Sequence, residues 1–322
     1  MKKNDYLFAV ASVRAKENSL LKQGDLEQLI NIEDYKKAVL FLNEKGYELP
    51  ETSEYSKVLD DELEATWNYI YSAAPEAEAL RALIVKNDFQ NLKAILKAEI
   101  IRESADKHFV KPSVIEPEKL KEAVSKRDFS ELPEFISVPA QKALEIITTT
   151  GSGQLCDAVL DKGALEAIIY FASLDGDNVL KEFAEEYVSC TDIKTAYRAV
   201  KTGKNSVFIS SSVAKTSKLD VDSLVSSASE GMEGFLEYLV SAGFSDYKDA
   251  LDVGASAFEK YCDDKILSVI KKAKMTAFGA SPLAAYFIAK ETELKCIRII
   301  LSAKLSHVSG EIIRERMREL YV

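Results

Sequence analysis

The chain has 322 residues with 52 acidic and 42 basic side chains, so its formal net charge at pH 7 is −10. This balance argues against a general nucleic-acid-binding protein, which needs a positive surface for the phosphate backbone. Hydrophobic residues make up 47% of the sequence, and only 13 Gly and 7 Pro interrupt it, which favours long helices around substantial cores. No apolar run reaches the roughly 18 residues that would predict a membrane-spanning helix.

The N-terminal stretch MKKNDYLFAVASVRAKENSLL places two lysines ahead of apolar residues. Arg14, Lys16 and Glu17 cut that apolar stretch short, so it fails as a signal peptide and predicts an amphipathic helix over 6–21. The four cysteines form no CxxC pair, which indicates reduced packing residues in a cytosolic protein. They are Cys156, Cys190, Cys262 and Cys296.

Helix-breaking residues divide the first third of the chain into helical stretches. Gly24 provides a break, and Asp25 is a candidate N-cap for a helix that begins near Leu26. A long helical stretch follows over 53–103, kinked or broken near Pro75.

The rest of the chain continues in the same way. Long helices are predicted over 140–201, with turns at Gly151 and Asp175. The segment 201–217 contains a short β-like run, SVFISSS, and we interpret it as a loop or an extended helix end. Strand signals with period 2 are otherwise missing, so the predicted fold class is all-α. Further breaks are expected at Gly46, Pro50, Lys111-Pro112, Glu116-Pro117, Gly243, Gly254 and Gly279 to Pro282.

One helical phrase occurs three times in the chain. It reads NLKAILKA from Asn91, DIKTAYRA from Asp192 and CIRIILSA from Cys296. Its apolar positions follow the stripe of an amphipathic helix, so we expect the first apolar residue of each copy to be buried. In each copy this residue is followed by a base, giving the pairs Leu92 and Lys93, Ile193 and Lys194, and Ile297 and Arg298.

A second phrase precedes each copy of the first. It reads LEQLINIEDYKKAVLFL from Leu26, LKEAVSKRDFSELPEFI from Leu120 and, more weakly, VDSLVSSASEGMEGFLEYL from Val221. A repeat of this length is too long for one solenoid unit of two or three helices. We interpret it as a triplicated helical lobe, with lobes over 1–110, 111–214 and 215–322 related by pseudo-threefold symmetry.

Fragments that look like enzyme motifs each lack an essential part. TTTGSGQ, from Thr148, lacks the GK[ST] ending of a phosphate loop. Asp175, Asp177 and Glu186 stand at positions 1, 3 and 12 of a calcium loop, but Leu180 occupies the position that needs glycine.

Acidic and histidine patterns are equally incomplete. The acidic segment DDELE, from Asp60, has no second metal-binding helix to form the site of a prenyl-diphosphate-type synthase. The two histidines, His108 and His307, have no partner at metal-ligand spacing. We therefore expect no catalytic residue, no cofactor and no metal site.

The C-terminal region is basic within an acidic chain. From residue 265 to residue 322 there are eleven Lys and Arg against five Glu, a local net charge of +6, so the rest carries −16. Either this is a solvated helix surface, or it is a contact surface for an acidic partner or anionic head groups. Its end, IIRERMREL, predicts a helix with Ile312, Ile313, Met317 and Leu320 as a buried stripe. Arg314, Arg316 and Arg318 would pair locally with Glu311, Glu315 and Glu319.

Three segments carry a resemblance to a known family. The ending YFIAKETELKCIRIILSAKLSHVSGEIIRERMRELYV, from Tyr286, resembles the C-terminus of the C subunit of bacterial and archaeal V/A-type rotary ATPases, the counterpart of the d subunit of eukaryotic V-ATPases. The opening from Tyr6 and the middle segment from Val179 resemble the same family. Cys190 and Asp192 are a small departure within the middle segment. The resemblance spans one family-wide domain over 5–321.

The resemblance implies a non-catalytic rotor subunit with three helical lobes that form a funnel. Its implied partners are the central shaft subunits and the membrane rotor ring, with no nucleic acid and no small-molecule substrate. It implies a chain that is monomeric when isolated and that lies at the cytoplasmic face of the membrane through its complex, transmitting torque between ATP hydrolysis or synthesis and proton or sodium transport. The alternative is a helical-repeat adaptor unrelated to rotary ATPases. Candidate shaft or ring contacts are Lys93, Lys194, Arg298, Arg314, Arg316 and Arg318.

Overall fold

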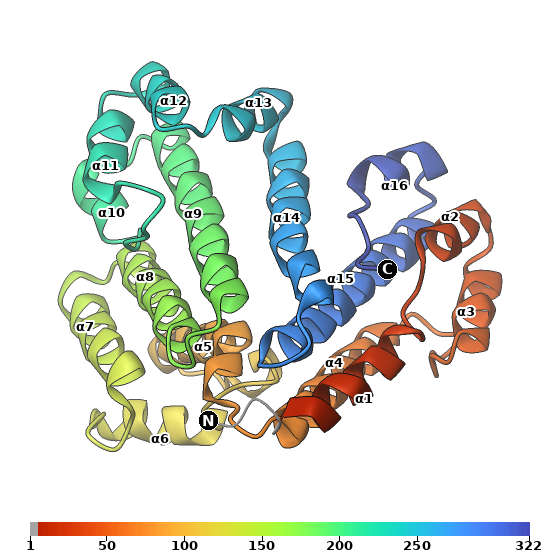
Figure 1. Cartoon of the computed structure of the whole chain (residues 1–322). Helices are drawn as coiled ribbons and strands as arrows, with labels where there is room; N and C mark the ends of the chain where they lie inside the picture. Colours follow the sequence, from red (N-terminus) through yellow and green to blue (C-terminus); the bar gives the residue numbers. More distant parts are fainter. Residues whose placement is uncertain (1–5) are drawn as a thin grey trace. The chain divides into compact units, whose positions relative to one another are not determined.

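The computed structural model describes residues 6–322, and every regular element within that range is helical (Figure 1). The predicted all-α class is therefore confirmed. The α-helices are α1 (Leu7–Glu17), α2 (Gln23–Asn31), α3 (Tyr35–Glu44), α4 (Tyr55–Ala73), α5 (Val85–Ile101), α6 (Pro117–Lys126), α7 (Glu134–Thr150), α8 (Gly153–Ala172), α9 (Asn178–Lys201), α10 (Ser206–Ser210), α11 (Val221–Ser229), α12 (Met232–Ser241), α13 (Ser245–Val253), α14 (Ala255–Lys271), α15 (Ser281–Leu305) and α16 (Gly310–Arg316). Short 3-10 helices are η2 (Glu78–Leu83), η3 (Asp106–His108) and η4 (Lys272–Met275).

The helices form two compact units. The terminal unit contains residues 6–77 and 250–322, so it combines the first four helices with the last three. The central unit contains residues 78–249 and is built mainly from α5 to α12. The lobe boundaries proposed from the sequence stay a prediction, and both of them fall within the central unit.

Helix α8 is the hub of the central unit, because it packs against α5, α7 and α9 (Figure 1). Close packing at this hub requires a glycine. A Cβ atom on Gly163 would lie 2.8 Å from the ring of Phe89 on α5 and 2.8 Å from Pro139 on α7. Real Cβ atoms do not approach other atoms so closely, so a larger residue at this position would push the three helices apart.

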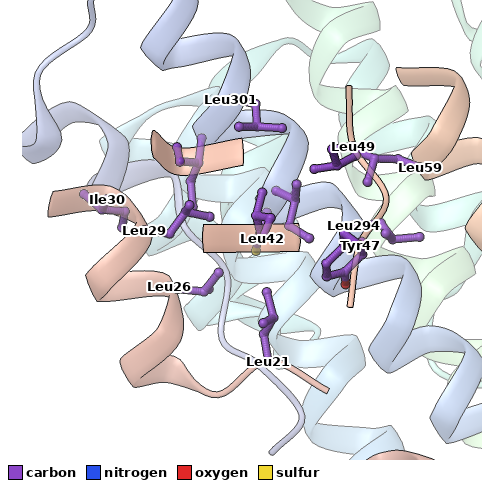
Figure 2. Close-up of a cluster of buried hydrophobic side chains, with 14 of the residues drawn as sticks. Leu21, Leu26, Leu29, Ile30, Leu42, Tyr47, Leu49, Leu59, Leu294 and Leu301 are labelled. Carbon is purple, nitrogen blue, oxygen red and sulfur yellow. The ribbon is translucent and has the colours of Figure 1, made fainter. Parts of the chain in front are cut away.

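Helix α15 is the centre of the terminal unit. Pro282 lies in its first turn, where the missing backbone N–H costs nothing. All residues from Ser281 to Lys290 are buried, because α1, α4 and α14 pack around this part of the helix. Its later turns enter a core with α2 and α3, where Leu294 and Leu301 meet Leu26 and other leucines (Figure 2).

The three copies of the repeated phrase lie in α5, α9 and α15, which have 17, 24 and 25 residues and are called the long helices below. Leu92, Ile193 and Ile297 are all fully buried, as the sequence predicts. Each long helix also receives the helices of a second phrase. Helix α6 packs on α5, α11 and α12 pack on α9, and α2 and α3 pack on α15. Helices α5 and α9 come before the helices that pack on them in the sequence. Helix α15, near the end of the chain, is instead packed by α2 and α3 from the start of the chain.

Two local predictions were wrong. Helix α2 begins at Gln23, so Gly24 lies within its first turn and does not break it. Asp25 is not the N-cap but the third residue of the helix, where its carboxylate accepts the backbone N–H of Lys22 at 2.8 Å. The β-like run SVFISSS, interpreted as a loop or an extended helix end, contains the separate short helix α10, because the side chain of Asn205 accepts the N–H of Phe208 at 3.0 Å and caps its first turn. Tertiary context and capping outweigh the β-propensity of a short run.

Other helix boundaries follow the predicted breakers. Pro75 lies between α4 and η2, and Gly151 ends α7 with a positive φ of 66°. Asp177 caps α9 by accepting the N–H groups of Val179 and Leu180. The N-terminal helix is shorter than expected and ends at Glu17. All four cysteines are buried and unbridged.

Truncating the buried residue of any repeated phrase should destabilise the protein strongly. We expect Leu92→Ala, Ile193→Ala and Ile297→Ala each to lower the free energy of unfolding by roughly 2–4 kcal/mol, because each leaves a cavity in a packed core. Denaturant unfolding would measure this. The matched control is Leu40→Ala at a position that is 60% exposed, which should change stability by less than about 0.5 kcal/mol. Equal effects at buried and exposed positions would contradict the core assignment.

Candidate interaction surface

The candidate bases of the central unit lie on α5 and α9. Lys93 is 9% exposed, and its ammonium group pairs with the carboxylate of Asp161 on α8. One turn later, Lys97 pairs with Asp157 of the same helix at 2.8 Å. Lys194 is half-buried on α9. Lys93 therefore links α5 to α8 through its ion pair with Asp161.

Arg298 is the candidate base of α15. Its guanidinium group pairs with the carboxylate of Asp60 on α4 at 2.6 Å. Both side chains remain partly accessible to solvent, so the pair contributes little to stability. Asp60 begins the acidic segment DDELE, and part of that segment therefore serves to hold two helices of the terminal unit together.

The three C-terminal arginines have different environments. Arg314 lies on α16, where it pairs with Glu27 at 3.0 Å and donates to the side chain of Asn31 at 2.6 Å. Arg318 is 7% exposed and pairs with Asp263 of α14 at 2.8 Å. The side chain of Arg316 is exposed, and within residues 6–322 it has no hydrogen bond or ion pair.

The predicted local pairing along IIRERMREL was wrong, because the helix ends at Arg316. Met317 has an extended backbone, with φ −69° and ψ 146°. Residues after it are therefore no longer placed for the i±3 and i±4 pairs of a helix. Glu319 pairs with Lys271 of α14 at 3.1 Å instead of with an arginine of its own segment.

The buried stripe predicted for this segment was right in part. Ile313, Met317 and Leu320 belong to the core, but Ile312 is 45% exposed. The chain end is therefore docked by three apolar side chains and by ion pairs to α2 and α14.

A buried ionic network in the terminal unit was missed by the sequence analysis. Glu293 of α15 is 1% exposed, and its carboxylate accepts the backbone N–H of Leu21 and the hydroxyl of Tyr47. Lys290, also on α15, pairs with Glu293 at 2.9 Å and with the more exposed Glu62 at 3.1 Å. Burial and the nearby Glu293 carboxylate raise the pKa of Tyr47. The sequence signal was KETE inside a largely apolar stretch.

The central unit contains a similar network. Glu186 of α9 is 3% exposed, and it accepts the hydroxyl of Tyr247 and pairs with Lys218 at 2.6 Å. Burial raises the pKa of Tyr247. In both networks a tyrosine that follows a second-phrase helix reaches a buried carboxylate on a long helix. Each network links a long helix to the segment that carries the tyrosine.

Several large apolar side chains of the terminal unit are exposed. Phe8 on α1 is 81% exposed, and Met275 at the end of η4 is 91% exposed. Within residues 6–322, no helix is both long and apolar enough to cross a membrane. In the same range, no group of three or more His, Cys, Asp or Glu side chains gathers at a spacing that would hold a metal ion.

Long packed helices with structural ion pairs define an all-helical protein of two compact units. The chain belongs to the ATP synthase (C/AC39) subunit family, whose model matches residues 9–316.

Named relatives match at almost full length. The chain is 24% identical over 319 residues to the C subunit of the V-type sodium ATPase of Enterococcus hirae, covering 96% of this chain and 97% of that protein. It is 24% identical to the C subunit of the A-type ATP synthase of Methanocaldococcus jannaschii, covering 98% and 86%. It is 22% identical to the C subunit of the V-type ATP synthase of Thermus thermophilus, covering 94% and 95%. The resemblance found in the sequence is thereby confirmed.

Removing the charge of Glu293 should destabilise the terminal unit. We expect Glu293→Gln to lower the free energy of unfolding by about 3–5 kcal/mol, because it leaves the buried ammonium group of Lys290 with only the more exposed Glu62. Thermal and denaturant unfolding would measure the loss. Glu311→Gln, on the exposed face of α16, is the matched control. The double variant Lys290→Met, Glu293→Gln should recover part of the loss. If it is no more stable than the single variant, the network is not an ion pair of this kind.

Replacing Arg318 by methionine should lower the stability of the protein much more than replacing Arg316. We expect Arg318→Met to cost about 1–3 kcal/mol, because it removes a charged hydrogen bond to Asp263 from a buried position. Arg316→Met should leave the melting temperature almost unchanged, since its side chain is exposed. The reverse order of melting temperatures would contradict the assignment of Arg318 as a structural residue.

Proposed function

We propose that this chain is a non-catalytic rotor subunit of a V/A-type ATPase. In this role it links the central shaft to the membrane ring and transmits torque between ATP chemistry and ion transport. Membership of the ATP synthase (C/AC39) subunit family over residues 9–316 is the observation that carries the proposal. The chain would work at the cytoplasmic face of the membrane, held there by its partners and monomeric when isolated.

The construction of the chain is suited to this task. A torque-transmitting part must resist bending, and helices of 17 to 25 residues with fully buried stripes give it stiffness. The ion pairs between helices serve the same purpose. We further propose that α5, α9 and α15 are the equivalent helices of three lobes around a pseudo-threefold axis, which together form a funnel.

A helical-repeat adaptor unrelated to rotary ATPases is not favoured. Such an adaptor would share the helical composition but not a family match across nearly the whole chain. The relatives with similar sequences also match almost the whole length of this chain.

Reconstitution tests the proposal directly. The purified chain would be mixed with the shaft subunits of the same organism, and with vesicles that carry its rotor ring. We expect a stoichiometric complex with the shaft by size-exclusion chromatography, and sedimentation with ring-containing vesicles but not with empty ones. A chain that remains monomeric with the shaft and stays in the supernatant with ring vesicles would overturn the proposal.

Charge reversal then identifies the bases that contact the shaft. Lys194→Glu and Arg298→Glu change the two bases that are more exposed than Lys93. Lys93→Glu would place a charge at a buried position beside Asp161 and confuse folding with binding. If these bases meet acidic groups of the shaft, the reversed variants should bind at least tenfold more weakly at low salt, where such contacts are least screened. Lys57→Glu, at an exposed position of α4, is the control. Unchanged affinity would assign Lys194 and Arg298 to the surface of their own units.

A further inference from the structure

The first residue of the repeated phrase is polar in α5, α9 and α15, and in α5 and α9 it binds the segment that follows the helix. Asn91 accepts the N–H of Val110 at 2.7 Å and donates to its carbonyl oxygen at 3.0 Å. Asp192 accepts the N–H of Ala214. At the third position, the Cys296 thiol lies near the backbone N–H of Arg318. In α5 and α9 the side chain therefore fastens a returning segment to the helix, through an amide in one and a carboxyl group in the other.

Asp192 is the carboxylic acid among the three residues, and its charged form is poorly compensated. It is fully buried, and its two carboxylate oxygens share the single N–H of Ala214, each at 3.3 Å. Asn91 makes two short bonds at the equivalent position. Within the described residues, Asp192 has no ion pair, and Lys162 of α8, the cation whose charge acts on it, donates to the carbonyl oxygen of Ser210 at 3.1 Å.

We infer that Asp192 is a proton-linked latch, whose carboxyl group keeps its proton while the segment around Ala214 is docked on α9 and releases it when that segment opens. This segment leads into α11 and α12, which pack on α9. The protonation state of Asp192 therefore affects how firmly α11 and α12 are held on α9. The inference concerns the central unit alone and does not rest on the proposed function.

The electrostatic surroundings agree with this geometry. Burial raises the pKa of Asp192 from 3.8 to about 8, and the N–H of Ala214 and the charge of Lys162 oppose this shift only in part. An acid whose pKa is raised by folding stabilises the docked state fully below its unfolded value, and this stabilisation is lost as pH rises to the folded value. The latch thus weakens progressively between about pH 4 and about pH 8.

Other ionisable groups around α9 do not compensate Asp192. Helix α10 has none, and Lys162 is the cation that faces the site from α8. On α9 itself, Glu186 lies nearly two turns away and is paired with Lys218. The acids of α11 and α12 are exposed, namely Asp222, Glu233 and Glu237, and Tyr238 donates to the carbonyl oxygen of Asp220.

Hydrogen exchange at the Ala214 amide of the full chain tests the latch. Base-catalysed exchange accelerates about tenfold per pH unit, and an opening that releases one proton adds about another tenfold. We therefore expect the wild-type rate to rise by about 100-fold per unit from about pH 5 to about pH 8, and by about tenfold per unit above that. In Asp192→Asn, which copies the residue at the equivalent position 91, the rise should be about tenfold per unit throughout.

A control variant and an infrared measurement test whether Asp192 itself carries the proton. Glu233→Gln removes an exposed acid of α12 and should retain the wild-type profile. The infrared spectrum of the wild type at about pH 6.5, minus that of Asp192→Asn, should contain the carbonyl band of one protonated carboxyl group, lost as pH rises past about 8. A wild-type rate that rises only tenfold per unit, or a difference spectrum without that band, would overturn the inference.

Discussion

The apolar surfaces of the long helices must be shielded from water, and the rest of the structure depends on this constraint. Helices α5, α9 and α15 carry apolar residues on so much of their surface that none could remain stable in water alone. Each is covered by neighbouring helices. In α5 and α9 the buried side chains of Asn91 and Asp192 also tie the returning segment to the helix. Apolar burial supplies most of the stability, and the polar contacts fix the register at which the next helices begin.

Much of the fold could be predicted from local pattern because helix formation here is governed by local signals. The apolar stripes predicted the burial of Leu92, Ile193 and Ile297, and breakers such as Pro75 and Gly151 marked helix ends. The association of α2 and α3 with α15 could not be predicted. The spacing of the phrases does not say which long helix the apolar faces of α2 and α3 will pack on. That pairing depends on how well every other helix could cover the same faces.

The candidate site was less predictable, because a basic residue has the same sequence signature whether it is paired within the chain or available to a partner. Lys93, Arg314 and Arg318 pair with acids of other helices, while the side chain of Arg316 is exposed and has no hydrogen bond or ion pair inside the described chain. The C-terminal arginines were assigned to local glutamates on the assumption of a continuous helix. The extended backbone at Met317 removes that assumption and lets Arg318 reach Asp263. Family membership, not residue chemistry, is what points to a role in a rotary ATPase.

The terminal unit is made from both ends of the chain, and this has a consequence for biosynthesis. Leu26, Leu29 and Leu42 are completed as a core only by Leu294, Leu301 and their neighbours (Figure 2). At ordinary elongation rates of about 5–20 residues per second, the N-terminal helices would wait roughly 10–50 s for α15 to leave the ribosome. During that interval their apolar faces lack their native cover, whereas the central unit is complete before α15 is made. Chaperones that bind nascent chains would therefore engage the first helices of this chain rather than the middle ones.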